Sequence, residues 1–78
     1  MRFEWKEYEN NWSVFIHGQK NPVSVAILNK KTFRLKDGIT GYVKNINAKT
    51  IEEAKILAEQ VLVEHWKRVK KELSEIDL

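Results

Sequence analysis

The pattern of apolar and polar positions predicts one long amphipathic helix in the C-terminal part of the chain. From Thr50 to Leu73, apolar side chains recur at the i, i+3, i+4, i+7 spacing of a single helix face. Thr50 is suited to cap this helix, because its hydroxyl can accept from the backbone N–H of Glu53 while the Glu53 carboxylate accepts from the N–H of Thr50. The face that should cover a sheet consists of Ile51, Ala54, Ala58, Val61, Leu62, His65, Val69 and Leu73.

The residues before this helix alternate between apolar and polar positions, which predicts short strands. The third of them, rich in β-branched residues, is expected at the centre of the sheet. The Asp37-Gly38 pair is a turn signal that should precede the final strand. Residues 32–36 also alternate, and the pattern leaves open whether they form a separate strand. The other expected strands cover residues 2–8, 12–17, 23–28 and 39–46.

Together these elements predict an α+β fold, in which an antiparallel sheet of three to five strands is followed by one long C-terminal helix packed on one face. Residues 1–78 are expected to form a single domain, with the sheet over 2–46, the helix over 50–73 and a short tail over 74–78. Such a helix is about 36 Å long, whereas a seven-residue strand spans about 23 Å. The C-terminal end of the helix should therefore extend beyond the sheet.

Composition excludes several classes of chemistry. The chain has no cysteine, so disulfides, thiolate metal sites and cysteine nucleophiles are ruled out. Its uninterrupted apolar runs, such as Val25 to Leu28, are far shorter than the ~20 residues of a membrane-spanning helix. No signal peptide or anchor is recognisable. We therefore expect a small basic protein of the cytoplasm, without membrane contact.

The sequence offers little basis for catalysis. It contains two histidines, and no Gly-rich phosphate loop or nucleophile elbow. His17 lies on a predicted strand and His65 within the helix stripe, where a hydrogen-bonded structural histidine is the more frequent case. Neither has the spacing of a metal ligand, and Glu52 and Glu53 are explained by the favourable field at a helix N-terminus. We predict no enzyme, no catalytic residues, no metal and no cofactor.

The basic charge is concentrated in one part of the chain. The net charge is +3, but residues 19–49 alone carry +6. A basic patch of this kind can face phosphates or an acidic protein surface. The alternative is a solvated, lysine-rich surface that keeps strand edges from aggregating.

The sheet face away from the helix is the first candidate binding surface. We expect the opposite, helix-facing side to consist of Phe3, Trp5, Val14, Ile16, Val25, Ile27 and Val43. Arg2 and Lys6 then lie on the open face, where cations and aromatics would alternate. Nucleic-acid-binding proteins and protein interfaces both use that combination, although ordinary cross-strand pairs would give the same pattern. The candidate binding residues are Tyr8, Phe15, His17, Arg34, Lys36, Tyr42 and Lys44.

The helix provides the second candidate surface. Ile56 and Val63 lie on its side away from the predicted core stripe, with Trp66 at the margin. Val69 and Leu73 lie on the end that should extend beyond the sheet. Scattered exposed apolar residues are common. Otherwise these residues form a partner contact, or the seam of a homodimer in which two C-terminal helices cross in antiparallel orientation.

The order of the elements, with Thr50-Ile51-Glu52-Glu53-Ala54-Lys55 opening a single helix, resembles many small proteins encoded by phages and mobile elements. This helix start, together with Trp12-Ser13-Val14-Phe15-Ile16, is similar to plant ethylene-response-type DNA-binding domains and to arm-binding domains of transposon integrases, whose three-stranded sheet enters the major groove. Most of their characteristic arginines and glycines are absent here. The helix start also resembles HicB-type antitoxins, without their Pro-rich strand motif.

Small phage proteins of this size include inhibitors that dock on host machinery, among them anti-CRISPR proteins. The resemblance thus implies a non-catalytic module that docks on a protein or protein–nucleic acid complex in the host cytoplasm. The alternative function is direct DNA or RNA binding through the basic, aromatic face of the sheet. Partner identity and salt dependence distinguish the two hypotheses.

Overall fold

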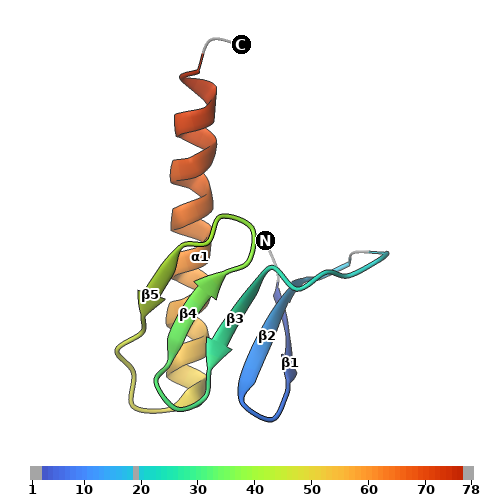
Figure 1. Ribbon diagram of the computed structural model, residues 1–78, viewed down its shortest axis with the longest axis vertical. Coiled ribbons are helices and arrows are strands. Elements are labelled where there is room, and N and C mark those ends of the chain that lie inside the picture. The colour runs from blue at the N-terminus through green and yellow to red at the C-terminus, as the bar shows by residue number, and fades with distance from the viewer. Residues whose placement is uncertain (1–2, 19, 77–78) are drawn as a thin grey trace.

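The computed structural model describes residues 3–18 and 20–76. It contains a five-stranded antiparallel sheet followed by one long helix (Figure 1), which confirms the predicted α+β fold class. Residues 34–37 form a strand of their own, which settles the question left open for residues 32–36. The elements are β1 (Phe3–Glu7), β2 (Asn11–Ile16), β3 (Ala26–Asn29), β4 (Arg34–Asp37), β5 (Val43–Asn45) and α1 (Ile51–Ser74).

The strands follow one another across the sheet in the order of the chain. β3 lies in the middle, as predicted (Figure 1). Short turns connect β1 to β2, β3 to β4 and β4 to β5, whereas the longer segment of residues 17–25 separates β2 from β3. Between β3 and β4, the side-chain oxygen of Asn29 accepts from the backbone N–H groups of Lys31 and Thr32 at 2.8 and 3.0 Å. This Asx-type turn reverses the chain between the two strands, and β4 begins at Arg34.

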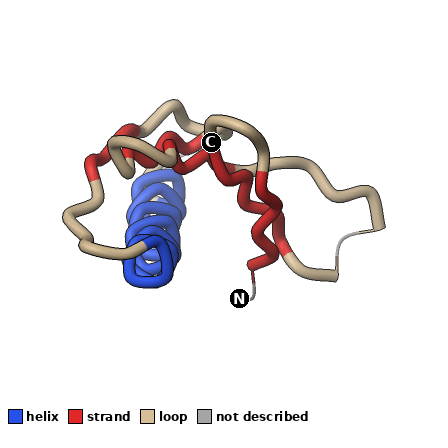
Figure 2. The backbone as a smooth tube through the Cα atoms, turned by 90° about the horizontal axis from the view of Figure 1, so that it is seen from below, coloured by secondary structure: helices blue, strands red, loops and turns tan. Residues whose placement is uncertain are grey.

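The core lies between the sheet and the N-terminal half of α1. Ala54, Ala58 and Leu62 are fully buried on the helix, and the two alanines allow its backbone to approach the strands closely. Figure 2 shows α1 on one side of the sheet, with β1 curling down beside it. Among the described elements, no helix covers the opposite side of the sheet. The strand residues buried against the helix are Val14, Ala26, Leu28 and Leu35.

The prediction for the central strand was wrong by one residue. Ala26 and Leu28 face the helix, whereas Ile27 points outward and is 42% exposed. Val25 donates its N–H to the carbonyl of Val14, and Ala26 also lies opposite Val14. Val25 and Ala26 thus both lie opposite Val14, as in a β-bulge. The extra residue shifts the alternation of inward and outward side chains by one position. Val25 remains buried.

The helix begins and caps as predicted, with one difference. The Thr50 hydroxyl accepts from the Glu53 N–H at 3.2 Å, but the Glu53 carboxylate accepts from the N–H of Lys49, at 3.5 Å, instead of that of Thr50. Figure 1 shows the C-terminal turns of α1 extending well beyond the sheet. Leu73 and Ile76 are 58% and 53% exposed there.

Two earlier expectations concern residues that are not described. Arg2, placed on the open face of the sheet, and residues 77–78 of the expected tail lie outside the described ranges. Within those ranges, no helix combines the length and the apolar character needed to cross a membrane.

Candidate binding surfaces

The open face of the sheet is organised in rows that cross the strands. The register places Lys6 beside Ser13, Ser13 beside Ile27, Ile27 beside Lys36, and Lys36 beside Val43. Because directly opposite residues share a face, this row runs across all five strands. Two further pairs of outward residues lie beside this row. They are Glu4 with Phe15, and Arg34 with Asn45.

Most of the predicted sheet-face residues do lie on this open side. Phe15, Arg34 and Lys36 point outward from β2 and β4. Tyr8 follows β1 and is 44% exposed, with the Lys6 ammonium 5.7 Å from its ring centre. His17 follows β2, and its Nδ1 lies 2.6 Å from a carboxylate oxygen of Glu4. Their role in binding stays a prediction.

Tyr42 and Lys44 lie on the other side, so their assignment to the open face was wrong. Tyr42 stacks on His65 of α1 with ring centres 4.2 Å apart and planes 13° from parallel. Lys44 lies opposite Leu35, whose side chain faces the helix, although Lys44 is itself exposed at the sheet edge. The cause is the register of β5. Val43 pairs with Lys36 and is therefore the outward residue.

The open face is shallowly hollowed at two places. A hollow of about 660 Å³ next to β1 is lined by the outward aromatics Tyr8 and Phe15 together with Glu4, Trp5, Lys6 and Pro22. A smaller one, of about 280 Å³, is lined by Ile27, Asn29, Arg34, Lys36 and Val43. Both combine apolar side chains with cations.

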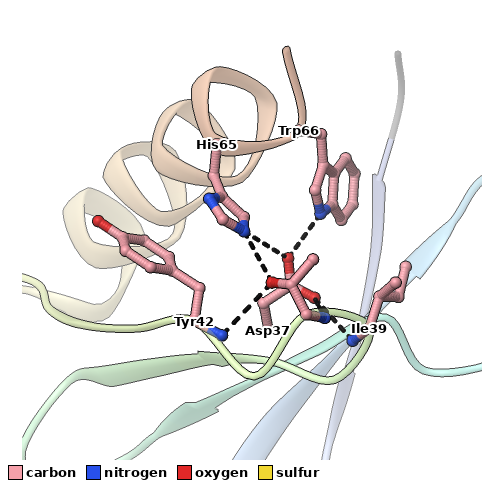
Figure 3. Close-up of polar contacts among 6 residues, drawn as sticks. Asp37, Ile39, Tyr42, His65 and Trp66 are labelled. Carbon is pink, nitrogen blue, oxygen red and sulfur yellow. Dashed lines mark hydrogen bonds and ion pairs between the residues drawn. The ribbon is translucent and has the colours of Figure 1, made fainter. Parts of the chain in front are cut away.

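A polar cluster on the helix side is centred on Asp37, whose side chain is fully buried. One carboxylate oxygen accepts from the N–H groups of Ile39 and Thr40, at 2.7 and 3.2 Å. The other accepts from the indole Nε1–H of Trp66 at 2.6 Å, and lies 3.7 Å from Nε2 of His65 (Figure 3). Asp37 therefore joins the turn before β5 to the helix.

This cluster contains an aspartate, a histidine and a threonine, but not in the geometry of a nucleophilic triad. In a triad the carboxylate and the hydroxyl contact different ring nitrogens of the histidine. Here the Thr40 hydroxyl lies 2.7 Å from Nε2 of His65, the same atom that faces Asp37. The arrangement satisfies a buried carboxylate and orients the turn. His65 is hydrogen-bonded within the fold, as its position in the helix stripe predicted.

The side of α1 that carries Ile56 and Val63 faces a groove beside β1. Ile56 is 58% exposed. Trp5 donates its Nε1–H to Glu59, one of the groove residues, at 2.9 Å, and the Phe3 and Trp66 ring centres lie 5.8 Å apart. The hollow has a volume of about 400 Å³ and is lined by Phe3, Ile56, Glu59, Gln60, Val63, Glu64 and Lys67.

Comparisons of the chain with protein-family models, with curated proteins and with solved structures found no match. Among the described residues, no three His, Asp or Glu side chains are grouped closely enough to hold a metal ion.

Sequence reasoning missed Asp37, Ile27 and Val43 as features of these surfaces. Asp37 was assigned only to a turn, because its partner Trp66 lies far along the chain. Ile27 and Val43 were assigned to the core, because an outward aliphatic residue looks like a core residue in an alternating pattern. A polar residue opposite each of them, Ser13 and Lys36, is the signal that indicates the open face once the register is known.

Proposed function

We propose that the protein is a non-catalytic binding module that docks on an acidic protein surface through the open face of its sheet. The observation that carries this proposal is the row from Lys6 to Val43. Ile27 lies in the middle of this row and Val43 at its β5 end, and they are 42% and 36% exposed to water, which is an unfavourable neighbour for aliphatic side chains. Lys6, Arg34 and Lys36 surround them, and among the described strand residues of this face Glu4 is the one carboxylate.

An apolar centre with a charged rim is the usual composition of a protein-binding surface. The cations on the rim select an acidic partner and speed its association. The resemblance to small phage inhibitors adds the expected class of partner, a host-defence complex that handles nucleic acid. Because the nucleic-acid-binding surfaces of such a complex are themselves basic, the docking site on it would be an acidic protein surface outside them.

Direct DNA or RNA binding is the second candidate, and the chemistry of the face supports it less well. Single-stranded nucleic acid is held by aromatic rings that stack on bases. With Tyr42 on the helix side, the described aromatics of the open face are Tyr8 and Phe15, both near β1, and the centre is aliphatic. Arg34 and Lys36 would still contact phosphates.

The test compares capture by the wild type with capture by two charge variants. Arg34→Glu with Lys36→Glu reverses the rim of the open face, whereas Lys31→Glu with Lys49→Glu reverses two exposed cations in turns. We expect a partner captured by the wild type to be lost with the first variant, retained with the second, and unaffected by nuclease. Equal capture by both variants contradicts the proposal, and loss on nuclease treatment favours the second candidate.

The expected homodimer through Val69 and Leu73 stays a prediction. The end of α1 that carries these residues extends past the sheet (Figure 1). Two such ends could bury their apolar side chains against each other, which contributes about 1.5 to 3 kcal/mol for each fully buried residue. Sedimentation of a Val69→Asp, Leu73→Asp double variant measures whether any self-association depends on it.

A further inference from the structure

β1 is an edge strand, and part of its backbone hydrogen-bonding capacity is not used by β2. Tyr8 donates its N–H to the carbonyl of Asn11 at 2.9 Å, so these two residues form a hydrogen-bonded pair. Because hydrogen-bonded and non-hydrogen-bonded pairs alternate along an antiparallel ladder, Lys6 and Glu4 also bond to β2. The outward-directed N–H and C=O groups are then those of Phe3, Trp5 and Glu7.

We propose that this edge pairs with the same edge of a second copy of the chain, antiparallel and centred on Trp5. The two Trp5 residues then lie opposite each other as a hydrogen-bonded pair, and Phe3 of each copy lies opposite Glu7 of the other. Every outward-directed group of β1 gains a partner in this register. The two sheets join into one continuous sheet around a two-fold axis, the commonest symmetry of protein dimers, and both helices lie on the same side of it.

Charge complementarity selects this register. Glu4 and Lys6 both point to the open face, and pairing centred on Trp5 places Glu4 of each copy opposite Lys6 of the other. Opposite charges at directly facing positions stabilise an antiparallel pair, and like charges destabilise it. Centring the pair on Glu4 or on Lys6 instead would oppose two glutamates or two lysines. A lysine on an edge strand usually discourages pairing, but here the reversed copy neutralises it.

The groove beside β1 supplies apolar surface for the same contact. Phe3 and Trp5 point to the helix side of the edge, where Phe3 lines the groove together with Ile56 and Val63. In the paired arrangement the grooves of the two copies adjoin under the shared sheet, so that Phe3 and Ile56 are shielded from water on both sides of the axis. This gives Ile56 and Val63, singled out on the helix as contact residues, a specific partner. The dimer does not depend on the proposed function of the open face.

A charge swap tests the pairing. Lys6→Glu places two carboxylates opposite each other at both symmetric positions, and Glu4→Lys places two cations there. We expect each single variant to weaken the dimer at least about tenfold in sedimentation. The double variant restores opposite charges and should return to within about threefold of the wild type. A wild type that is monomeric at high micromolar concentration, or a double variant as weak as the single ones, overturns the proposal.

The register is tested by cross-linking, since the chain has no cysteine of its own. Residues at the Glu4 and Lys6 positions of opposite copies would form a non-hydrogen-bonded pair with Cα atoms about 4.5 Å apart, within the range of about 4.4 to 6.8 Å that a disulfide spans. In a mixture of the Glu4→Cys and Lys6→Cys proteins, disulfides between the two variants should therefore form faster than disulfides form in a sample of either variant alone. Lys36→Cys, on the same face but away from the edge, gives the background rate. Equal rates in all samples contradict the register.

The C-terminal helix provides the matched control. The double variant Val69→Asp, Leu73→Asp removes the helix-end seam, which is the alternative to pairing through β1, and leaves β1 untouched, so a dimer paired through β1 should form with unchanged affinity. If this variant is a folded monomer by circular dichroism and sedimentation, the dimer is formed by the helix ends and the β1 proposal is overturned.

Discussion

The two faces of the sheet are built from the same five short strands but differ in what determines their side chains. Toward α1, Val14, Leu28 and Leu35 are almost fully buried, and their volumes must match those of Ala54 and Ala58. On the open face, Ile27 and Val43 contact solvent beside lysines. Packing constrains the side chains of the helix-covered face. The side chains of the open face are constrained by the partner or solvent that they contact. Changes on the first should therefore act on stability, and changes on the second on binding.

The largest effect expected from this comparison is on the helix-covered face. Leu62→Ala removes most of a fully buried side chain from the centre of α1 and should lower the free energy of unfolding by about 2 to 5 kcal/mol. The matched change on the open face, Ile27→Ala, should lower it by less than about 1 kcal/mol. Chemical denaturation followed by circular dichroism measures both. Similar losses for the two variants would mean that the open face is not open in solution.

A smaller effect is expected at the polar part of the same face. Trp66→Phe keeps an aromatic ring beside Phe3 but removes the N–H that Asp37 accepts at 2.6 Å. Because the Asp37 side chain is fully buried, the lost hydrogen bond leaves a carboxylate oxygen without its shortest contact, which should destabilise the fold by about 1 to 3 kcal/mol.

Trp5→Phe is the control for this change. It removes a similar bond, to Glu59, at a site that water can reach, and it should have the smaller effect on the free energy of unfolding. If Trp66→Phe unfolds at the same denaturant concentration as the wild type, the bond between Trp66 and Asp37 does not hold the turn to the helix.

The accuracy of the sequence-based prediction differs between the helix and the strands of the sheet. The helix could be predicted to within a residue at each end, because its stripe is long and Thr50 is a local signal that needs no partner elsewhere. The register of β3 could not. Val25 to Leu28 is a continuous apolar run, which carries no information about which alternate residues face inward, and the bulge opposite Val14 depends on a neighbouring strand.

Tyr42 was assigned to the wrong face of the sheet for a similar reason. Alternation was continued through the turn, whereas Asp37 binds the N–H groups of Ile39 and Thr40 and so delays the start of β5. Gly41, with φ of +79°, reverses the chain where a β-branched residue would be strained. The roles of Asp37 and Trp66 depend on a contact between residues far apart in the chain, which a local pattern cannot predict.

The smallest effect on stability is expected on the open face, where the question is what it binds. Arg34→Ala with Lys36→Ala changes two exposed side chains and should alter the free energy of unfolding by no more than about 0.5 kcal/mol for each. If the face contacts phosphates directly, the same variant should bind nucleic acid more weakly, with a salt dependence shallower by about one to two units of slope. Tyr42→Ala should then leave affinity unchanged, because Tyr42 stacks on His65 on the other side of the sheet. An electrophoretic shift assay at low salt, with duplex and single-stranded probes, separates the cases. Binding that weakens with the Arg34 and Lys36 changes but not with Tyr42→Ala assigns nucleic acid to the open face. A wild type that shifts no probe leaves an acidic protein as the partner expected for that face.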